Sequence, residues 1–455
     1  MARVLLFLVL LAAFSFGQGA SIPGIWTGIL DVGVAKLHLV LHADSPGHPT
    51  LDSIEQRAMG MPIDEFHLDG TRVSFSLSRI GASFQGEFTE NGTRIQGMFK
   101  QGGKSLPLSF ERTESALAVP RRPQTPQPPF PYKSEDVTFP SVAKEITLAG
   151  TLTIPAGAGP FPGVVMITGS GPQDRDETLM GHKPFWVTAD YLSRHGVAVL
   201  RVDDRGVGKS GGNYRSATAA DFADDAEGAA TYLRARKEIG RVGLIGHSEG
   251  GMIAPVVANR SHDVNFVVLL AGTAVPGDQV IIEQQRLILK AMGQPDGFIE
   301  KYRDLERQVI AIAKSETDTA VAQAKMRDAA AGLPAEARQA SASQFEQAAT
   351  PWFHYFVNYD PAPALRNLKQ PVLALNGALD TQVSAAQNLP AIAAALEAGG
   401  NPDYQIVKLP GLNHLFQTAK TGAPSEYSAI EETMAPVVLD IVSGWILRHQ
   451  EVDRK

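Results

Sequence analysis

The chain contains no cysteine among its 455 residues. This absence excludes disulfide bonds, thiolate metal ligands, a cysteine nucleophile and lipid attachment through an N-terminal cysteine. The chain also lacks any basic block, and its net charge of −7 disfavours nucleic acid and anionic membranes as partners. His38 and His42 share one face of an expected strand, but no third ligand lies at a suitable spacing. We therefore expect neither a metal nor another cofactor.

Long hydrophobic runs are scarce as well, but one stands at the start of the chain. A basic head that ends at Arg3 is followed by the largely apolar residues 4–16. This run is too short to span a bilayer, and the pattern is typical of a secretory signal peptide over residues 1–17, cleaved before Gln18. An uncleaved anchor is the alternative. Exported proteins without cysteine are ordinary in bacteria, so we expect a periplasmic or extracellular bacterial protein that does not bind a membrane after cleavage.

Changes of pattern predict three segments after the signal. Residues 18–113 read as short alternating strands between turn residues, which indicates a small antiparallel β-barrel or β-sandwich domain. Residues 114–134 hold several prolines and are interpreted as a linker. From residue 135 to residue 455 strands alternate with helices, which is typical of an α/β domain.

The apolar strands of this α/β domain are continuous enough to be buried on both faces of a mainly parallel sheet. They are expected at 146–154, 163–167, 197–202, 242–245, 264–270, 371–375 and 404–409. In an open α/β sheet the ligand lies at the carboxyl ends of the strands. Residues 278–360 have helical periodicity and interrupt the alternation. We interpret them as a helical cap over those strand ends, with helices packed beside the sheet as the alternative.

One pentapeptide predicts the nucleophile. Gly246-His247-Ser248-Glu249-Gly250 follows an apolar strand and precedes a stretch that is compatible with a helix. This is the G-x-S-x-G pattern in a strand–turn–helix setting, which places a serine on a sharp and strained corner above a sheet. Ser248 is therefore the expected nucleophile.

A serine hydroxyl needs a base, and the base needs a carboxylate that orients it. His414 follows the last expected strand, and Asp380 follows the strand before it. Both therefore lie at the same edge of the sheet as the nucleophile, and we assign them as base and acid. The alternatives that stay open are His182 and His354 for the base and Asp360 for the acid.

Acyl transfer also needs hydrogen-bond donors for the oxyanion. The main-chain N–H of Glu249, directly after the nucleophile, is one candidate. The second is expected from the glycine-containing loop 168–172, which follows the strand 163–167. We expect the main-chain N–H of Ser170 to be this second donor, with that of Gly171 as the alternative.

A second loop resembles a phosphate-binding motif only superficially. Gly208-Lys209-Ser210 matches the end of that motif, but the motif requires a glycine where Asp203 stands. We therefore expect no nucleotide, and we expect Arg205 to be held by neighbouring carbonyl or carboxylate groups.

Taken together, residues 135–455 resemble the α/β-hydrolase superfamily. Its motifs occur here in the same order: the D-R-G-x-G-x-S turn, the elbow at 246–250, the loop with Asp380 and the loop with Asn413-His414. The resemblance implies an α/β-hydrolase fold with a helical cap. Thr168 departs from the superfamily pattern, because many members have histidine at this position. This difference affects the assignment of the second oxyanion donor and not that of the triad.

The whole chain resembles a group of exported bacterial two-domain serine esterases with an N-terminal β domain, through the segments 169–176 and 412–416. This resemblance implies hydrolysis of small-molecule carboxylic esters, usually with short acyl chains. A serine peptidase or acyl-amide hydrolase on the same scaffold is an alternative, because ester and amide cleavage share the oxyanion machinery. A polymer-binding β domain that delivers the esterase to a glycan is another. The sequence does not specify the oligomeric state.

Overall fold

The structure is a computed structural model that describes residues 22–32, 36–43, 49–54, 56, 58–89, 92–113, 121–143, 145–332 and 335–449. The predicted signal peptide lies outside the described residues, as do residues 114–120 of the predicted linker. The chain divides after residue 119 into two compact units.

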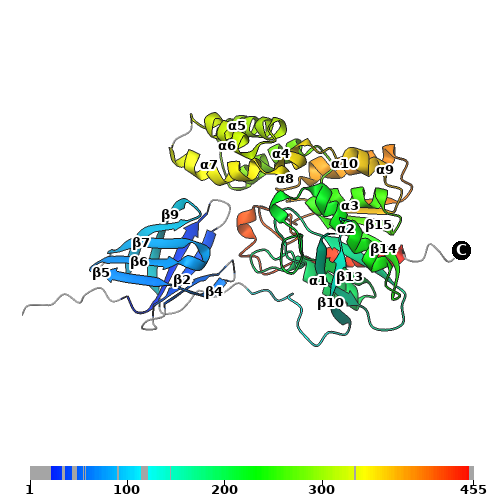
Figure 1. Cartoon of the computed structure of the whole chain (residues 1–455), viewed down its shortest axis with the longest axis horizontal. Helices are drawn as coiled ribbons and strands as arrows, with labels where there is room; N and C mark the ends of the chain where they lie inside the picture. Colours follow the sequence, from blue (N-terminus) through cyan, green and yellow to red (C-terminus); the bar gives the residue numbers. More distant parts are fainter. Residues whose placement is uncertain are drawn as a thin grey trace, which may run out of the picture. The chain divides into compact units, whose positions relative to one another are not determined.

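The first unit is one antiparallel sheet whose strands run in the order β4-β3-β2-β1-β9-β8-β7-β6-β5 (Figure 1). The strands are β1 (Ile25–Asp31), β2 (Lys36–His42), β3 (Thr50–Ser53), β4 (Ala58–Pro62), β5 (Glu65–Asp69), β6 (Arg72–Leu77), β7 (Ala82–Thr89), β8 (Arg94–Gln101) and β9 (Lys104–Thr113). Alternate residues of β6, namely Val73, Phe75 and Leu77, are buried in the core. The predicted antiparallel β domain is confirmed, as a single sheet and not as two stacked sheets.

The second unit is built on a sheet with the order β10-β11-β13-β12-β14-β15-β16-β17. Strands β10, β11 and β13 pair antiparallel, and all neighbours from β13 to β17 pair parallel. The strands are β10 (Lys133–Pro140), β11 (Thr147–Ile154), β12 (Phe161–Ile167), β13 (Ala198–Val202), β14 (Ile239–His247), β15 (Val264–Leu270), β16 (Val372–Gly377) and β17 (Tyr404–Leu409). The predicted mainly parallel sheet is confirmed. Strand β10 was not predicted, because as an edge strand it is largely solvent-exposed and carries no apolar run.

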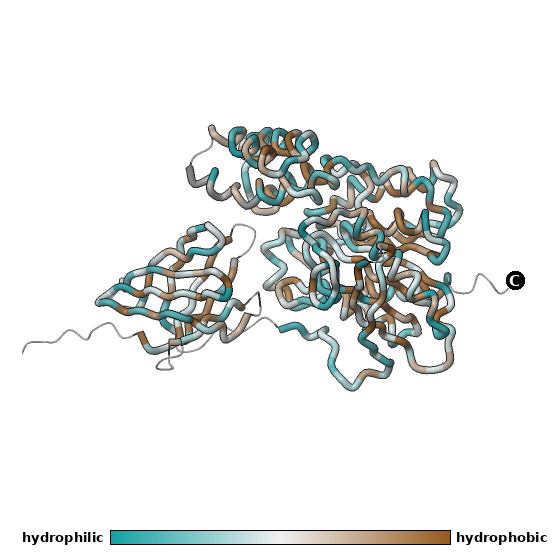
Figure 2. Tube along the Cα trace, in the orientation of Figure 1, coloured by the Kyte–Doolittle hydropathy of each residue, from teal (hydrophilic) through white to brown (hydrophobic). Residues whose placement is uncertain are grey.

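Helices cover both faces of this sheet (Figure 1). Residues Val164 and Met166 of β12 pack in one core, and Val165 and Ile167 pack in the other. Burial on both faces explains why these strands read as continuous apolar runs. Figure 2 shows the hydrophobic residues gathered along the strands inside this unit. The helices of the first core are α1 (Pro184–Arg194) and α11 (Pro436–Arg448), and those of the second are α2 (Ala219–Arg234), α3 (Glu249–Arg260), α9 (Ala362–Asn367) and α10 (Ala385–Ala398).

The helical insertion that was predicted as a cap is present between β15 and β16. It consists of α4 (Gly277–Ala291), α5 (Asp296–Ser315), α6 (Thr319–Ala329), α7 (Ala335–Ala348) and α8 (Pro351–Asn358). These helices form a layer beyond α2 and α3 (Figure 1). Among the helices of the described residues, none has both the length and the apolar character that crossing a bilayer requires.

Candidate active site

The expected nucleophile lies on a strained corner between β14 and α3. Ser248 has φ 54° and ψ −114°, a conformation that residues with a side chain rarely adopt. Its main-chain N–H donates to the carbonyl oxygen of Leu270 at 2.9 Å. The corner is therefore tied to the end of the neighbouring strand β15.

The two glycines of the elbow allow main-chain segments to approach closely. A Cβ atom at Gly246 would lie 2.1 Å from the carbonyl oxygen of Gly250. A Cβ atom at Gly250 would lie 2.2 Å from the carbonyl oxygen of Ile167, at the end of β12. Both distances are far below van der Waals contact, so the strand, the turn and the helix fit together only with glycine at these positions.

We expect Gly250→Ala to lower the free energy of unfolding by about 3 kcal/mol, because main-chain atoms of β12 would have to move. Urea denaturation measures this loss. Gly297→Ala is the matched control, since nothing lies within 4 Å of its Cβ position in α5, and it should leave stability unchanged or raise it by up to about 1 kcal/mol. Equal stabilities of the two variants would contradict this account of the elbow.

His414 and Asp380 are in direct contact. His414 follows β17 and Asp380 follows β16, and their Nδ1 and Oδ2 atoms lie 2.8 Å apart. Both residues are buried, each with 4% exposure. The other carboxylate oxygen of Asp380 accepts the main-chain N–H groups of Gln382 and Val383 at 2.8 and 2.9 Å. The carboxylate is thus fully hydrogen-bonded, and the histidine ring is oriented by it.

The loop that carries His414 is shaped by its neighbour Asn413. The Asn413 side chain is fully buried, and its Oδ1 atom accepts the main-chain N–H groups of Leu415 and Gln417. Its Nδ2 atom donates to the side chain of Gln417 at 3.0 Å. The asparagine therefore closes the turn from inside and presents the histidine at the end of the strand.

The alternative candidates for base and acid are engaged elsewhere. His182 contacts Thr433 and the carbonyl oxygen of Tyr427 through its two ring nitrogens. His354 contacts the carbonyl oxygen of Ala313 inside the cap. Asp360 is exposed and accepts the main-chain N–H of Ala362.

The loop after β12 lies against Ser248. The Cβ position of Gly169 is 3.2 Å from the Cβ atom of Ser248. The hydroxyl of Thr168 donates to Asp204 at 2.7 Å, and the same carboxylate accepts the main-chain N–H of Gln173 at 3.0 Å. Thr168 therefore fixes this loop to the turn after β13.

The main-chain N–H groups that could serve as oxyanion donors differ in their hydrogen-bond acceptors. The main-chain N–H of Gly171 donates to the hydroxyl of Tyr214, and that of Gly169 donates to Glu177 at 2.7 Å. Across the described part of the chain, no acceptor is recorded for the main-chain N–H of Ser170 or of Glu249. Ser170 is also exposed.

Arg205 is held as expected, by carboxylates of α2. Its guanidinium makes two hydrogen bonds to Asp225, at 2.7 and 2.8 Å, and one to Asp221 at 2.9 Å. The preceding Asp203 binds Arg175 with both of its carboxylate oxygens. The turn is therefore a structural support. Within the described ranges, no three histidine or carboxylate side chains converge as metal ligands.

The side chain of Glu249 links the elbow to the cap. Its Oε1 atom accepts the indole N–H of Trp352 in α8 at 2.7 Å, and it is also hydrogen-bonded by Ser170. Burial raises the pKa of Glu249 to about 7, against the effect of these two hydrogen bonds. Burial likewise raises the pKa of Asp204 to about 7.

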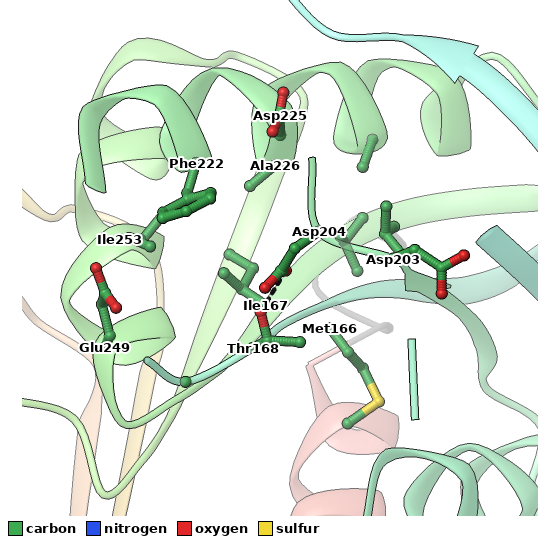
Figure 3. A pocket seen from close by; sticks show the side chains of 14 residues that line it. Met166, Ile167, Thr168, Asp203, Asp204, Phe222, Asp225, Ala226, Glu249 and Ile253 are labelled. Atoms are coloured by element: carbon green, nitrogen blue, oxygen red, sulfur yellow. Dashed lines mark hydrogen bonds between the residues drawn. The ribbon is translucent and has the colours of Figure 1, made fainter. Parts of the chain in front are cut away.

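Glu249 and Asp204 line the same small cavity, of about 40 Å³, between α2, α3 and the ends of β12 and β13 (Figure 3). Apolar side chains form the rest of its wall, among them Phe222 and Ile253. Gly169 also lines the cavity. Ser248 does not line it, although it lies between Glu249, its neighbour in the chain, and Gly169, whose Cβ position is 3.2 Å from the Ser248 Cβ atom.

A raised carboxyl pKa makes stability depend on pH. Between the ordinary value of 4.5 and about 7 for Glu249, the folded chain binds more protons than the unfolded chain, so stability falls as pH rises through this window. Glu249→Gln keeps an acceptor for Trp352 but cannot ionise. We expect it to match the wild type at pH 5 and to be more stable by about 1–3 kcal/mol at pH 8.

Thermal unfolding of both proteins at the two pH values measures this difference. Glu397→Gln, at an exposed position of α10, is the control and should show the same offset from wild type at pH 5 and at pH 8. If Glu249→Gln were no more stable relative to wild type at pH 8 than at pH 5, the raised pKa of the Glu249 carboxyl group would be contradicted.

Several residues of the site were missed by the sequence reasoning. Glu177, Asp204 and Trp352 come from loops or from the cap, and no periodic pattern marks them. Glu177 directly follows the segment 169–176, and its position after a glycine-containing loop was the available signal. The side chain of His247 faces Glu177 and the His414 carbonyl group.

Comparison with known proteins finds a protein family and a curated relative that are similar to parts of this chain. The family described as "Serine aminopeptidase, S33" matches residues 185–351. Esterase EstD of Thermotoga maritima is 29% identical over 309 residues, which are 67% of this chain and 67% of that protein.

Solved structures of an esterase and of an α/β-hydrolase are also similar at low identity. The Pyrococcus furiosus esterase Pf2001 is 14% identical, with 70% of this chain and 91% of that chain covered and a TM-score of 0.42. The α/β-hydrolase GrgF from Penicillium sp. sh18 is 17% identical, with coverage of 70% and 99% and a TM-score of 0.43.

Proposed function

We propose that this chain, an α/β-hydrolase by its fold, is a serine carboxylesterase in which Ser248, His414 and Asp380 form the catalytic triad. The observation that carries the proposal is the buried contact of 2.8 Å between His414 and Asp380, at the same sheet edge as the strained serine. The 29% identity to an esterase over two thirds of the chain supports ester hydrolysis.

The contact with Asp380 determines the tautomer of His414. A carboxylate accepts, so Nδ1 carries the proton and Nε2 has a lone pair. Nε2 takes the proton of the Ser248 hydroxyl as the serine oxygen attacks the ester carbonyl carbon. The imidazolium then gives that proton to the leaving alcohol, and an acyl-enzyme remains.

Water completes the cycle. His414 removes a proton from a water molecule, the hydroxide attacks the acyl carbon, and Ser248 leaves with the proton returned by the histidine. The products are a carboxylic acid and an alcohol. In each tetrahedral intermediate the negative oxygen is placed between the main-chain N–H groups of Glu249 and Ser170, and each donor contributes about 3 kcal/mol.

The acyl group of the substrate is proposed to be short. The cavity of about 40 Å³ beside Gly169 and Glu249 holds roughly three water-sized groups. A longer chain would have to displace side chains of α2 and α3 that form the wall of this cavity, such as Phe222 and Ile253. We also propose that the protein is exported, on the basis of its N-terminal sequence.

A series of p-nitrophenyl esters from acetate to decanoate tests the substrate class. We expect kcat/KM for acetate or butyrate to exceed that for decanoate at least tenfold, because the cavity admits only the short chains. Reaction with a fluorophosphonate followed by peptide mass spectrometry should locate the label on Ser248. A label on another residue would contradict the triad, and so would active protein that takes up no label. A preference for decanoate would contradict the short acyl pocket.

A serine peptidase is the second candidate, because the matched family is described as a serine aminopeptidase. Aminoacyl anilides compared with acyl esters of similar size distinguish the two activities. A higher kcat/KM on the anilides would favour the peptidase.

A further inference from the structure

A second acid–histidine pair lies beside the proposed triad. The Nδ1 atom of His247 is 2.9 Å from Oε1 of Glu177, and both side chains are buried, with 7% and 5% exposure. The ring centroids of His247 and His414 are 4.9 Å apart. Neither member of this pair has a role in the steps of hydrolysis described above.

Both ring nitrogens of His247 face oxygen acceptors. Nδ1 faces the Glu177 carboxylate, and Nε2 faces the carbonyl oxygen of His414 at 3.1 Å. A neutral imidazole carries one N–H and therefore can donate to only one of them. Donation to both requires the imidazolium form.

Glu177 has a second hydrogen-bond donor besides His247. The oxygen that contacts His247 also accepts the main-chain N–H of Gly169 at 2.7 Å, so both donors converge on one carboxylate oxygen. Burial alone would lower the pKa of His247, but the charge and hydrogen bond of Glu177, the carbonyl group of His414 and the charge of Asp380 together raise it.

The pair also connects three segments of the site. Glu177 binds the loop that carries Ser170, through Gly169, while His247 belongs to the elbow and binds the main chain of His414. The groups that face His247 are Glu177 after β12, Asp380 after β16, and His414 and the Phe416 ring after β17. Three loops of the sheet edge therefore meet at one ion pair.

We propose that Glu177 and His247 form a permanent ion pair that positions the Ser170 and His414 loops and keeps a positive charge beside the ring of His414. This inference rests on the proposed esterase function for its kinetic consequences. Loss of this positive charge in a variant is expected to make protonation of the base easier. Both residues act through others and are positioning residues.

His247→Gln tests the charge. Glutamine can still donate to the His414 carbonyl group, but it cannot carry the charge. We expect the midpoint of the acidic limb of the kcat/KM–pH profile to move up by about half to one pH unit, and the plateau rate to fall about tenfold. Glu177→Gln should move the midpoint in the same direction, because His247 then loses the partner that stabilises its second proton.

His195→Gln, at an exposed position, is the matched control and should leave the pH profile unchanged. A merely structural role for the pair predicts lower thermal stability with an unmoved acidic limb, and that result in both variants would overturn the proposal.

Nuclear magnetic resonance of protein labelled with nitrogen-15 at histidine gives a readout that needs no catalysis. At pH 8 the wild type should show one histidine with both ring nitrogens protonated. This signal should vanish in His247→Gln and change to a neutral ring in Glu177→Gln. A neutral His247 in the wild type would overturn the ion pair even if His247→Gln failed to fold. Absence of esterase activity would instead contradict only the proposed function.

Discussion

Replacing Ser248 by alanine is expected to lower kcat/KM for p-nitrophenyl acetate by about 10⁴- to 10⁶-fold. In the proposed mechanism this side chain supplies the oxygen that is acylated, and alanine leaves no hydroxyl on the strained corner at φ 54°. The folded structure should be retained, because alanine removes one oxygen and leaves the main-chain bond to Leu270 intact. Steady-state kinetics and circular dichroism measure the two effects.

Ser315→Ala is the matched control for this variant. Ser315 is exposed at the end of α5, and its hydroxyl contacts only carbonyl oxygens of the preceding turn. Its kcat/KM should stay within twofold of wild type. A folded Ser248→Ala protein with more than a tenth of wild-type activity would exclude the proposed nucleophile.

Asp380→Asn is expected to lower kcat by about 10³- to 10⁴-fold. In the wild type, one oxygen of Asp380 accepts two main-chain N–H groups and the other accepts the ring N–H of His414. Asparagine has one oxygen, which the two main-chain donors will keep. Its NH₂ group then faces Nδ1, and the histidine must move its proton to Nε2, where it can no longer accept the serine proton.

Asp403→Asn provides a strict control, because Asp403 also contacts a histidine ring, that of His449, at 3.1 Å. This second pair lies at the surface, with 51% of the Asp403 side chain exposed. Its loss should leave kcat unchanged. If Asp380→Asn retained kcat within tenfold of wild type, the tautomer argument would be wrong.

The sequence predicts the parts of the fold that depend on local patterns. Continuous apolar runs located the buried strands, and the G-x-S-x-G segment located the strained corner at Ser248. The contact of His414 with Asp380 could be expected because both follow parallel strands, whose ends meet at one edge. Strand β10 was not predicted, because its edge position leaves it largely exposed and without an apolar run.

The remaining parts of the site depend on contacts between distant loops. Glu177 meets His247 seventy positions later in the chain, and Trp352 meets Glu249 across 103 positions. Neither contact leaves a periodic trace in the sequence. No sequence pattern identified Asp204 as the acceptor of the Thr168 hydroxyl either. Thr168 itself was noticed only as a departure from the family pattern.

The side chain of Glu249 has a consequence for any assay near neutrality. With its pKa raised to about 7 by burial, roughly equal populations of charged and uncharged enzyme coexist in an ordinary buffer. Since the pKa of Asp204 is raised to about 7 as well, a rate constant measured there is a weighted mean over forms that differ in their charge near Ser248. A ranking of ionic and non-ionic substrates therefore depends on the acidity at which it is made.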